Sequence, residues 1–355
     1  NTEQAYSQRS AMEMAVTRYF KLSMPPSQTS GRLAGLPVGA LGLRVRIGSS
    51  ALACSCATVN AALAATSVPT QWPEFAKRVS GEWDGFGAEF TSHGKPVQLP
   101  ESVVPEAFRE WEVDVYDWQT QCPTLASSDS VNISYQNIKL LPTVGCEADA
   151  ATRYSVQERV PGTDATLFAY HPSGSYFAIW PIPGASTQYE LEHCLVNPAD
   201  PESRVRIIQT IRADPFISLL RMNVFSELWY GPFRNGDQLG GCAIGNSAFA
   251  STASLDASLI TGSWNGTSYS TSITSTDPNV IKELVVEEAH PTSKDSSDMV
   301  LLPLSCWGSI KENQGQTYCE VGWLFDHQSS SVSSRCIFSN DANIKEISMS
   351  WETKQ

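Results

Sequence analysis

The stretches GEWDGFGAEF, residues 81–90, and GSWNGTSYSTSI, residues 262–273, both open with Gly-x-Trp-x-Gly and continue as strand-like runs. Alternation of small or polar residues with apolar ones is the pattern of a β-strand that is buried on one face. Two copies of this opening, far apart in one chain, predict two β-domains built on the same plan.

Short candidate strands separated by turn-forming clusters of Gly, Pro, Asn and Asp follow each copy. This spacing is typical of an antiparallel sandwich or barrel. The segment REWEVDVYDW, residues 109–118, alternates strictly and is predicted to be a strand with Trp111, Val113 and Val115 on one face. The best helix candidate is PTQWPEFAKRVSG, residues 69–81, in which Trp72, Phe75 and Val79 would share one face.

The ends of the two halves also align as a degenerate repeat. Each runs through a Tyr- and Glu-containing strand, an Arg-led strand and a last strand that ends in Trp: YELEHCLV, RVRIIQTI and LRMNVFSELW against YCEVGWLF, SSRCIFSN and IKEISMSW. Residues 236–258 are rich in Gly, Ala and Ser and are predicted to be a linker between separate cores. We therefore expect a first barrel over 71–235, with its short N-terminal helix, and a second barrel over 259–355.

Residues 1–70 differ in character from the rest of the chain. They hold six basic residues and only two acids, Glu3 and Glu13, and no acid occurs between Glu13 and Glu74. A basic, Ser-rich and acid-poor leader is the mark of an organelle transit peptide. The composition predicts a plastid transit peptide removed near residues 54–69, with the stroma favoured over the thylakoid lumen; a disordered tail is the alternative interpretation.

Charge and cysteine content narrow the classes of partner. Residues 71–355 carry 18 of the 24 basic and 35 of the 37 acidic residues, a net charge of −17, which disfavours nucleic acid and anionic lipid. The longest apolar run, residues 51–65, is shorter than the ~18 residues of a membrane span. Seven of the nine Cys lie beyond the leader, none in a Cys-x-x-Cys pair, and are interpreted as buried free thiols.

No enzyme motif is present: the sequence lacks a Gly-x-Ser-x-Gly elbow, a His-Glu-x-x-His helix and a phosphate loop. The five His are scattered without ligand spacing, and His193, inside a candidate strand, is interpreted as structural: His93, His171, His193, His290 and His327. We predict no catalytic residue and no metal site.

Trp83 and Trp264 stand where the first strand of each barrel would begin. A large ring at this place can close the floor of a barrel, and a guanidinium from a late strand can stack on it. We expect Arg335 to cover Trp264, and Arg221 or Arg212 to cover Trp83. Both tryptophans are therefore predicted to be structural.

A Gly-x-Trp first strand followed by a late basic residue resembles the lipocalin and calycin superfamily. The C-terminal pattern CEVGWLF…SSRCIFSNDANIKEISMSWE, residues 319–352, resembles more particularly a two-barrel lipocalin-like family of unknown function from cyanobacteria and chloroplasts. That family is related to the S-type phycobiliprotein chromophore lyases. The resemblance covers residues ~80 to 355 and is clearest over 316–352.

This resemblance implies a fold and a ligand site. The fold would be mainly β, with two antiparallel lipocalin-like barrels in tandem after the transit peptide. In the lyase relatives a Glu and a Trp of an E-x-x-W strand and a nearby Arg line the barrel that receives a bilin, which would make Glu320, Trp323 and Arg335 ligand-binding residues here. Trp351 is predicted to add apolar wall. Arg335 is predicted to anchor a carboxylate of the ligand, with stacking on Trp264 as the alternative role, because one guanidinium cannot easily do both.

Three functions follow as expectations. The first is non-enzymatic binding of a small apolar or tetrapyrrole-like ligand in a plastid. The second is a bilin lyase-like enzyme, and the third is a structural or assembly factor of the photosynthetic apparatus whose barrels are filled by side chains. No cofactor is predicted apart from a possible tetrapyrrole or bilin ligand.

Overall fold

The computed structural model describes residues 69–144, 152–237, 247–274, 280–287 and 291–355. They belong to one compact unit that runs from Ala64 to Gln355. The expected transit peptide lies almost wholly outside the described residues, as do His290 and four of the cysteines: Cys54, Cys56, Cys146 and Cys242. Each of the other five cysteines is free and buried.

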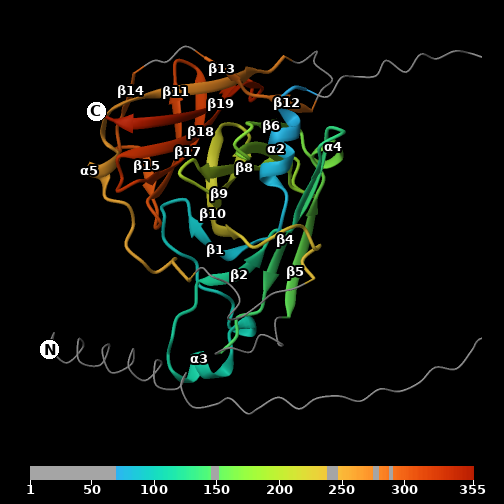
Figure 1. Ribbon diagram of the computed structural model, residues 1–355. Coiled ribbons are helices and arrows are strands. Elements are labelled where there is room, and N and C mark those ends of the chain that lie inside the picture. The colour runs from blue at the N-terminus through green and yellow to red at the C-terminus, as the bar shows by residue number, and fades with distance from the viewer. Residues whose placement is uncertain (1–68, 145–151, 238–246, 275–279, 288–290) are drawn as a thin grey trace, which may run out of the picture. The chain divides into compact units, whose positions relative to one another are not determined.

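The larger of two sheets has eleven strands in the order β12-β6-β7-β8-β9-β10-β1-β2-β4-β3, with β5 beside β4 (Figure 1). All its neighbours are antiparallel except β12 and β6. Its strands are β1 Trp83–Thr91, β2 Asp117–Gln121, β3 Thr124–Ser127, β4 Asn132–Leu140, β5 Arg153–Arg159, β6 Leu167–Tyr170, β7 Tyr176–Pro181, β8 Gln188–Asn197, β9 Asp200–Ala213, β10 Ile217–Trp229 and β12 Ile281–Glu283.

The smaller sheet has eight strands in the order β13-β11-β19-β18-β17-β16-β15, with β14 beside β11. Its strands are β11 Gly262–Ser272, β13 Val285–Val286, β14 Thr292–Lys294, β15 Met299–Leu301, β16 Cys306–Asn313, β17 Gln316–Phe325, β18 Ser330–Ser339 and β19 Ile344–Lys354. Short helices connect or precede strands: α2 Trp72–Val79, η1 Glu101–Val103, α3 Glu106–Glu110, α4 Pro161–Asp164 and α5 Ala257–Ile260. The helix predicted over 69–81 is thus confirmed as α2.

The strand order confirms the internal repeat. In each sheet the Gly-x-Trp strand pairs with the last strand of its half, which continues through the preceding strands in reverse order: β1-β10-β9-β8-β7-β6 against β11-β19-β18-β17-β16-β15. Trp83 and Trp264 are fully buried, and each donates its indole N–H to the carbonyl four residues earlier, at Val79 (2.9 Å) and Ile260 (2.8 Å). A helix end and a strand start are joined in the same way twice.

The second glycine of each Gly-x-Trp-x-Gly copy allows the last strand to approach closely. A Cβ on Gly85 would lie 1.9 Å from the carbonyl oxygen of Ser226, and one on Gly266 would lie 1.9 Å from that of Trp351. Such contacts are too short for any side chain, so the position requires glycine. The repeated motif therefore records a packing need of the first and last strands.

The two sheets pack against each other through one face each. Apolar clusters between them combine first-half side chains such as Met222 and Val224 with second-half ones such as Val321 and Val332. His193 Nδ1 also lies 2.9 Å from Ser334 Oγ on the other sheet, and β12, from beyond the expected linker, joins the first sheet. The expectation of separate cores is wrong, because each sheet buries this face only against the other.

The larger sheet is a curled half-barrel. Tyr135 of β4 donates a 2.8 Å hydrogen bond to Glu192 of β8, although four strands separate β4 from β8 in the sheet order. Arg206 of β9 reaches Asn137 of β4 in the same way, at 2.8 Å. Only a sheet bent around an interior brings such distant strands into contact. Helix α2 contributes Trp72 and Phe75 to the apolar part of this interior.

The strand predicted over 109–118 is wrong. Residues 106–110 form α3, Trp111 is 60% exposed, and the larger sheet resumes only at β2. Glu112 adopts a positive φ of 53°, which breaks an extended run. Periodicity alone suggested a strand here. In the described part of the chain, however, no strand pairs with the segment between β1 and β2.

Candidate functional site

The inner face of the curled sheet carries charged residues at alternate positions of three neighbouring strands. Because side chains alternate along a strand, residues two apart share a face. Glu190 and Glu192 of β8 therefore point the same way, as do Arg204 and Arg206 of β9, and Glu227 of β10 joins them. The strands place a ladder of ion pairs where a β interior normally holds apolar side chains.

Glu192 is the centre of this ladder. It is fully buried and accepts hydrogen bonds from Arg206 (2.7 Å), Tyr135 (2.8 Å), Tyr176 (2.9 Å) and Trp180 (2.9 Å). Burial alone would raise its pKa, but Arg206 and further cations lower it below the ordinary value. The carboxylate is thus ionised and held by four donors.

Glu227 completes the ladder with two guanidinium groups. Its carboxylate lies 2.7 Å from Arg204 Nε and 2.7 Å from Arg206 Nη2, all three side chains being fully buried. The Arg204 guanidinium also stacks on Trp83, with its carbon 4.1 Å from the ring centroid. Nη1 and Nη2 of Arg204 have no hydrogen-bond partner in the described structure, so its buried charge is met only by Glu227 and by the face of the Trp83 ring.

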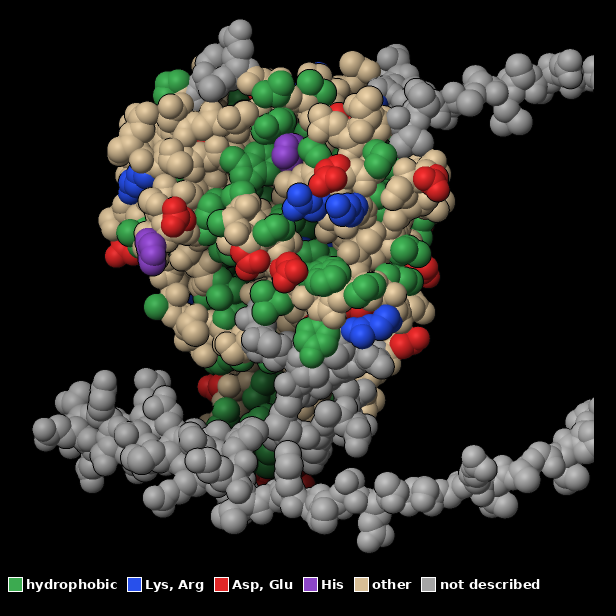
Figure 2. All heavy atoms as spheres, viewed as in Figure 1, with side chains coloured by type: hydrophobic (Ala, Val, Ile, Leu, Met, Phe, Trp, Pro, Cys, Tyr) green, Lys and Arg blue, Asp and Glu red, His purple; other side chains and the backbone are tan. Residues whose placement is uncertain are grey.

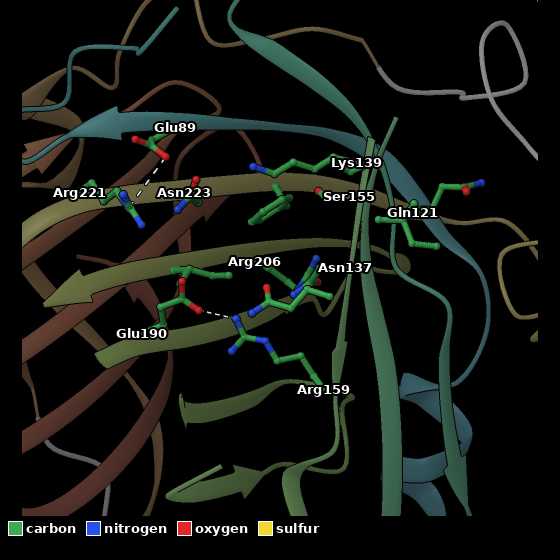
Figure 3. Close-up of a pocket in the computed structure, with 15 residues that line it drawn as sticks. Glu89, Gln121, Asn137, Lys139, Ser155, Arg159, Glu190, Arg206, Arg221 and Asn223 are labelled. Carbon is green, nitrogen blue, oxygen red and sulfur yellow. Dashed lines mark hydrogen bonds and ion pairs between the residues drawn. The ribbon is translucent and has the colours of Figure 1, made fainter. Parts of the chain in front are cut away.

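A cavity of about 290 Å³ opens beside the ladder (Figure 3). Its wall is mostly polar and comes from strands on both sides of the curl: Glu89, Thr120, Gln121, Asn137, Ile138, Lys139, Ser155, Gln157, Arg159, Glu190, Arg206, Ile208, Arg221, Asn223 and Phe225. We call it the larger-sheet cavity. None of these residues except Arg221 entered the sequence predictions, although the alternating charges of β8 and β9 were a visible sign of a polar interior.

Arg159 has unused hydrogen-bonding capacity in this cavity. Its side chain is 4% exposed and pairs through Nη2 with Glu190, toward which it points in Figure 3. Its Nε and Nη1 are buried without a hydrogen-bond partner in the described structure, and its guanidinium lies 4.5 Å from the Trp180 ring centroid. Burial opposes the charge, but Glu192 and Glu190 raise the pKa above its usual value, so the group stays cationic.

Lys139 is the second cation of this cavity that can still accept an anionic partner. Its ammonium lies 5.3 Å from the centroid of the Trp118 ring, and among the described residues no acid lies within ion-pair distance of it. Burial lowers the pKa of the ammonium from its ordinary value. Arg221, by contrast, has a loose partner in Glu89 at 3.9 Å.

The smaller sheet brings Glu320 and Arg335 together, as the sequence predicted. They are direct cross-strand neighbours on β17 and β18, and Arg335 Nη2 lies 3.1 Å from the Glu320 carboxylate. Lys294 of β14 lies 4.0 Å from Glu320 and 2.7 Å from Glu352. These charges line or adjoin a second cavity of about 330 Å³, the smaller-sheet cavity, whose wall also includes Trp307, Tyr318 and Lys311.

Trp323 and Trp351 do not face that cavity. Glu320 and Trp323 are three residues apart on one strand, so their side chains point to opposite faces. Trp323 packs in the apolar cluster between the sheets, and Trp351 lies there beside the rings of His171 (4.4 Å) and Tyr269 (5.4 Å). The four residues predicted to bind one ligand are thus divided between two sides of the smaller sheet.

The cations that cover the two structural tryptophans are not those predicted. Arg204, not Arg221 or Arg212, stacks on Trp83, and the ammonium groups of Lys294 and Lys354 each lie 5.9 Å from the Trp264 centroid. Trp264 pairs with Lys354, whereas Arg335 pairs with Ser348, six residues further along β19. At ~3.3 Å per residue this separates Arg335 from Trp264 by about 20 Å along the strand.

The register also corrects the alignment of the two halves. Gly85 pairs with Glu227 and Gly266 pairs with Glu352, so Glu227 and Glu352 occupy equivalent positions. When the register is followed from these two residues across the next strands of each sheet, Glu192 is the counterpart of Glu320. The counterpart of His193 is then Val321. His193 is fully buried between the sheets, and burial lowers its pKa to about 3.

Other classes of site find no support in the described part of the chain. No group of three or more His, Cys, Asp or Glu side chains gathers there as metal ligands would. No described helix has the length and apolarity that crossing a bilayer requires. On the face shown in Figure 2, basic and acidic side chains lie close to one another, so charges of both signs are mixed there.

Comparison with known proteins gives a likeness of fold. No protein-family model and no curated protein matches the sequence. A putative outer membrane protein of Bacteroides fragilis is matched over 79% of this chain and 99% of its own at 9% identity, with a TM-score of 0.18, too low to indicate a shared fold. A crystal structure from Nostoc punctiforme is matched over 81% of this chain and 100% of its own, at 12% identity and a TM-score of 0.50. The chain is therefore similar in fold to this protein of the DUF3598 family, itself of unknown function.

Proposed function

We propose that the protein is a non-enzymatic binding protein that holds a small organic anion in the larger-sheet cavity. The observation that carries this proposal is Arg159, a buried guanidinium with two N–H donor positions, Nε and Nη1, that lack a partner beside an open cavity. A buried donor without an acceptor costs ~1–3 kcal/mol, and more when the group is charged. Both atoms are buried in the described structure, so a carboxylate in the cavity would accept from them once the Arg159 side chain shifts toward it, and would then remove that cost.

The wall of the cavity favours a polar ligand of modest size. Its lining includes four amide side chains as well as the cations: Gln121, Asn137, Gln157 and Asn223. A volume of about 290 Å³ is at the lower end of the ~300–1,000 Å³ of typical ligand pockets. Both features support a ligand that is smaller and more polar than the tetrapyrrole expected from the resemblance to bilin-handling barrels.

Binding without catalysis is supported by the pairing of the acids in the cavity. Glu190 is ion-paired with Arg159, and Glu89 lies 3.9 Å from Arg221. A general base with a raised pKa, or a nucleophile beside such a base, would be needed for most hydrolytic or transfer chemistry. The lining residues suit recognition of charge better than proton transfer.

Isothermal titration calorimetry of the full chain with short monocarboxylates tests the proposal. We expect saturable binding that Arg159→Gln weakens at least about tenfold, since a charge-assisted hydrogen bond is worth ~1.5–3 kcal/mol. Arg159→Lys keeps the charge but loses the guanidinium donors, and should weaken binding by a comparable factor. Arg78→Gln, which removes an exposed cation from α2, is the matched control. Binding that is indifferent to Arg159 would contradict the proposal.

A carboxylate-bearing bilin in the smaller-sheet cavity would rest on Arg335 and Glu320, and a biliverdin titration repeated with Arg335→Ala would test it. A lipocalin-like origin of both sheets is supported by their repeated strand order and buried Gly-x-Trp motif. Location in the plastid is proposed from the acid-free leader, and import into isolated chloroplasts followed by N-terminal sequencing would test it.

A further inference from the structure

The larger-sheet cavity has a cation with unused capacity at each of two separated places. Arg159 lies on β5 opposite Tyr135 of β4, and Lys139 lies on β4 opposite Ser155 of β5. The backbone positions of the two residues are thus four residues apart along the paired strands, or about 13 Å at ~3.3 Å per residue. Figure 3 shows Lys139 and Arg159 on either side of Asn137.

Neutral polar groups fill the interval between these cations. Asn137 and Gln157 are direct cross-strand neighbours midway between the two, and both line the cavity. Asn137 accepts a hydrogen bond from Arg206 through its side-chain oxygen, which leaves its amide N–H₂ group as a donor. Along β4 and β5 the wall therefore presents one cation, then two amide side chains, and then the other cation.

From this arrangement we infer that the ligand is a linear dicarboxylate, with one carboxylate at Arg159 and the other at Lys139. This inference rests on the proposed function and specifies the ligand of the same cavity. Each end offers one cation with unused donors, which matches a singly charged carboxylate better than a doubly charged phosphate. Glu190, which is paired with Arg159, and Glu89, 3.9 Å from Arg221, also line the cavity, so a carboxylate at Arg159 joins an existing ion pair whereas one at Lys139 meets a cation that is unpaired among the described residues.

The test compares dicarboxylates of increasing length, glutarate, adipate and suberate, with monocarboxylates of the same carbon number, by calorimetry. We expect one diacid length to bind at least about tenfold more tightly than its matched monoacid, because a second charge-assisted contact forms. Lys139→Gln should remove that advantage, so that the diacid binds no more tightly than its matched monoacid. Lys139→Met, which keeps an unbranched chain over Trp118, should do the same. Arg78→Gln again serves as the control.

The outcomes separate this inference from the proposed function. If monoacids bind in an Arg159-dependent way but no diacid binds more tightly, the two-ended ligand is wrong and anion binding stands. The two-ended ligand is equally wrong if both Lys139 variants weaken monoacids and diacids alike while circular dichroism shows the fold intact. If neither monoacids nor diacids bind, the proposed function fails together with the inference.

Discussion

On the face that points away from their shared core, both sheets carry acids at equivalent positions, but the cations that neutralise these acids differ. In the larger sheet Glu192 and Glu227 share Arg206, a fully buried residue of β9. In the smaller sheet their counterparts Glu320 and Glu352 share Lys294, which comes from β14 beyond the first strand. The counterpart of Arg206 in the smaller sheet is Ser333.

This difference shows that the repeated backbone fixes where the acids stand, while the cations come from whichever neighbouring strand can reach them. In the larger sheet, Glu192 and Glu227 accept hydrogen bonds from the arginines of β9, and Glu192 also from side chains of β4 and β7, while Arg159 keeps two donors without a protein partner in the described structure. In the smaller sheet, Arg335 is 38% exposed, pairs with Glu320 through Nη2 and keeps one buried donor, Nε, without a partner in the described structure, against two for Arg159. The comparison therefore favours the larger-sheet cavity as the ligand site.

The largest expected effect comes from the tryptophans that the two halves share. Trp83→Ala and Trp264→Ala should each lower the free energy of unfolding by ~3–5 kcal/mol, because each leaves a buried void. Since the sheets share their apolar clusters, each variant should unfold in a single transition at lower denaturant concentration. Urea unfolding followed by fluorescence and circular dichroism measures this. Two separate transitions, with one unshifted, would show independent halves.

Removing one acid from each sheet tests whether the origin of the neutralising cation affects stability. Glu227→Gln should cost ~3–5 kcal/mol of stability, because it leaves Arg204 without an acid and weakens the pairing of Arg206 in a fully buried site. Glu352→Gln should cost less, because Lys294 keeps Glu320 at 4.0 Å. Equal losses in urea unfolding would mean that the source of the cation has no energetic consequence.

The residues that follow the two Gly-x-Trp motifs, Asp84 and Asn265, should make stability depend on pH through the larger sheet only. Asp84 is buried, and burial followed by Glu82 raises its pKa to about 7, whereas its counterpart Asn265 is exposed. The folded state then binds a proton that the unfolded chain releases near pH 3.8, so stability is lost as pH rises from about 4 to 7. Asp84→Asn should recover a few kcal/mol at pH 8 and almost nothing at pH 3.5.

The control for this pH effect is Asn265→Asp. At an exposed position the change should alter stability by less than ~0.5 kcal/mol at either pH. Thermal unfolding of both variants at pH 3.5 and pH 8 gives the four values needed. A gain from Asp84→Asn that is independent of pH would show that the Asp84 carboxyl does not titrate as proposed.

The smallest effect is expected at the ion pair predicted as a ligand anchor. Arg335→Gln removes a partly exposed contact with Glu320 and should cost ~1 kcal/mol or less. Urea unfolding at low and at 0.5 M salt measures it, and the loss should shrink as salt screens the pair. A loss above ~2 kcal/mol would indicate that the smaller sheet depends on Arg335 as strongly as the larger sheet depends on its ladder.

Much of the architecture could be predicted from the sequence because its causes are local. Alternation along strands, turn residues between them and the double Gly-x-Trp motif indicated a mainly β chain with a repeat, and Trp72, Phe75 and Val79 marked helix α2. The opposite orientation of Glu320 and Trp323 was also available from the period of a strand, and the E-x-x-W pattern taken from the resemblance obscured it. The strand expected over 109–118 failed because alternation does not supply a partner strand.

Only the tertiary structure decided which faces meet and where a cavity remains. The curl of the larger sheet brings Asn137 to Arg206, a contact between residues far apart in the chain, and no local pattern encodes it. The packing of both sheets through one shared core, and the choice of Arg204 over Arg221 for Trp83, depend likewise on register and curvature. Side-chain periodicity is a property of neighbours along the chain, whereas the partners of a buried charge are set by strands that meet only after folding.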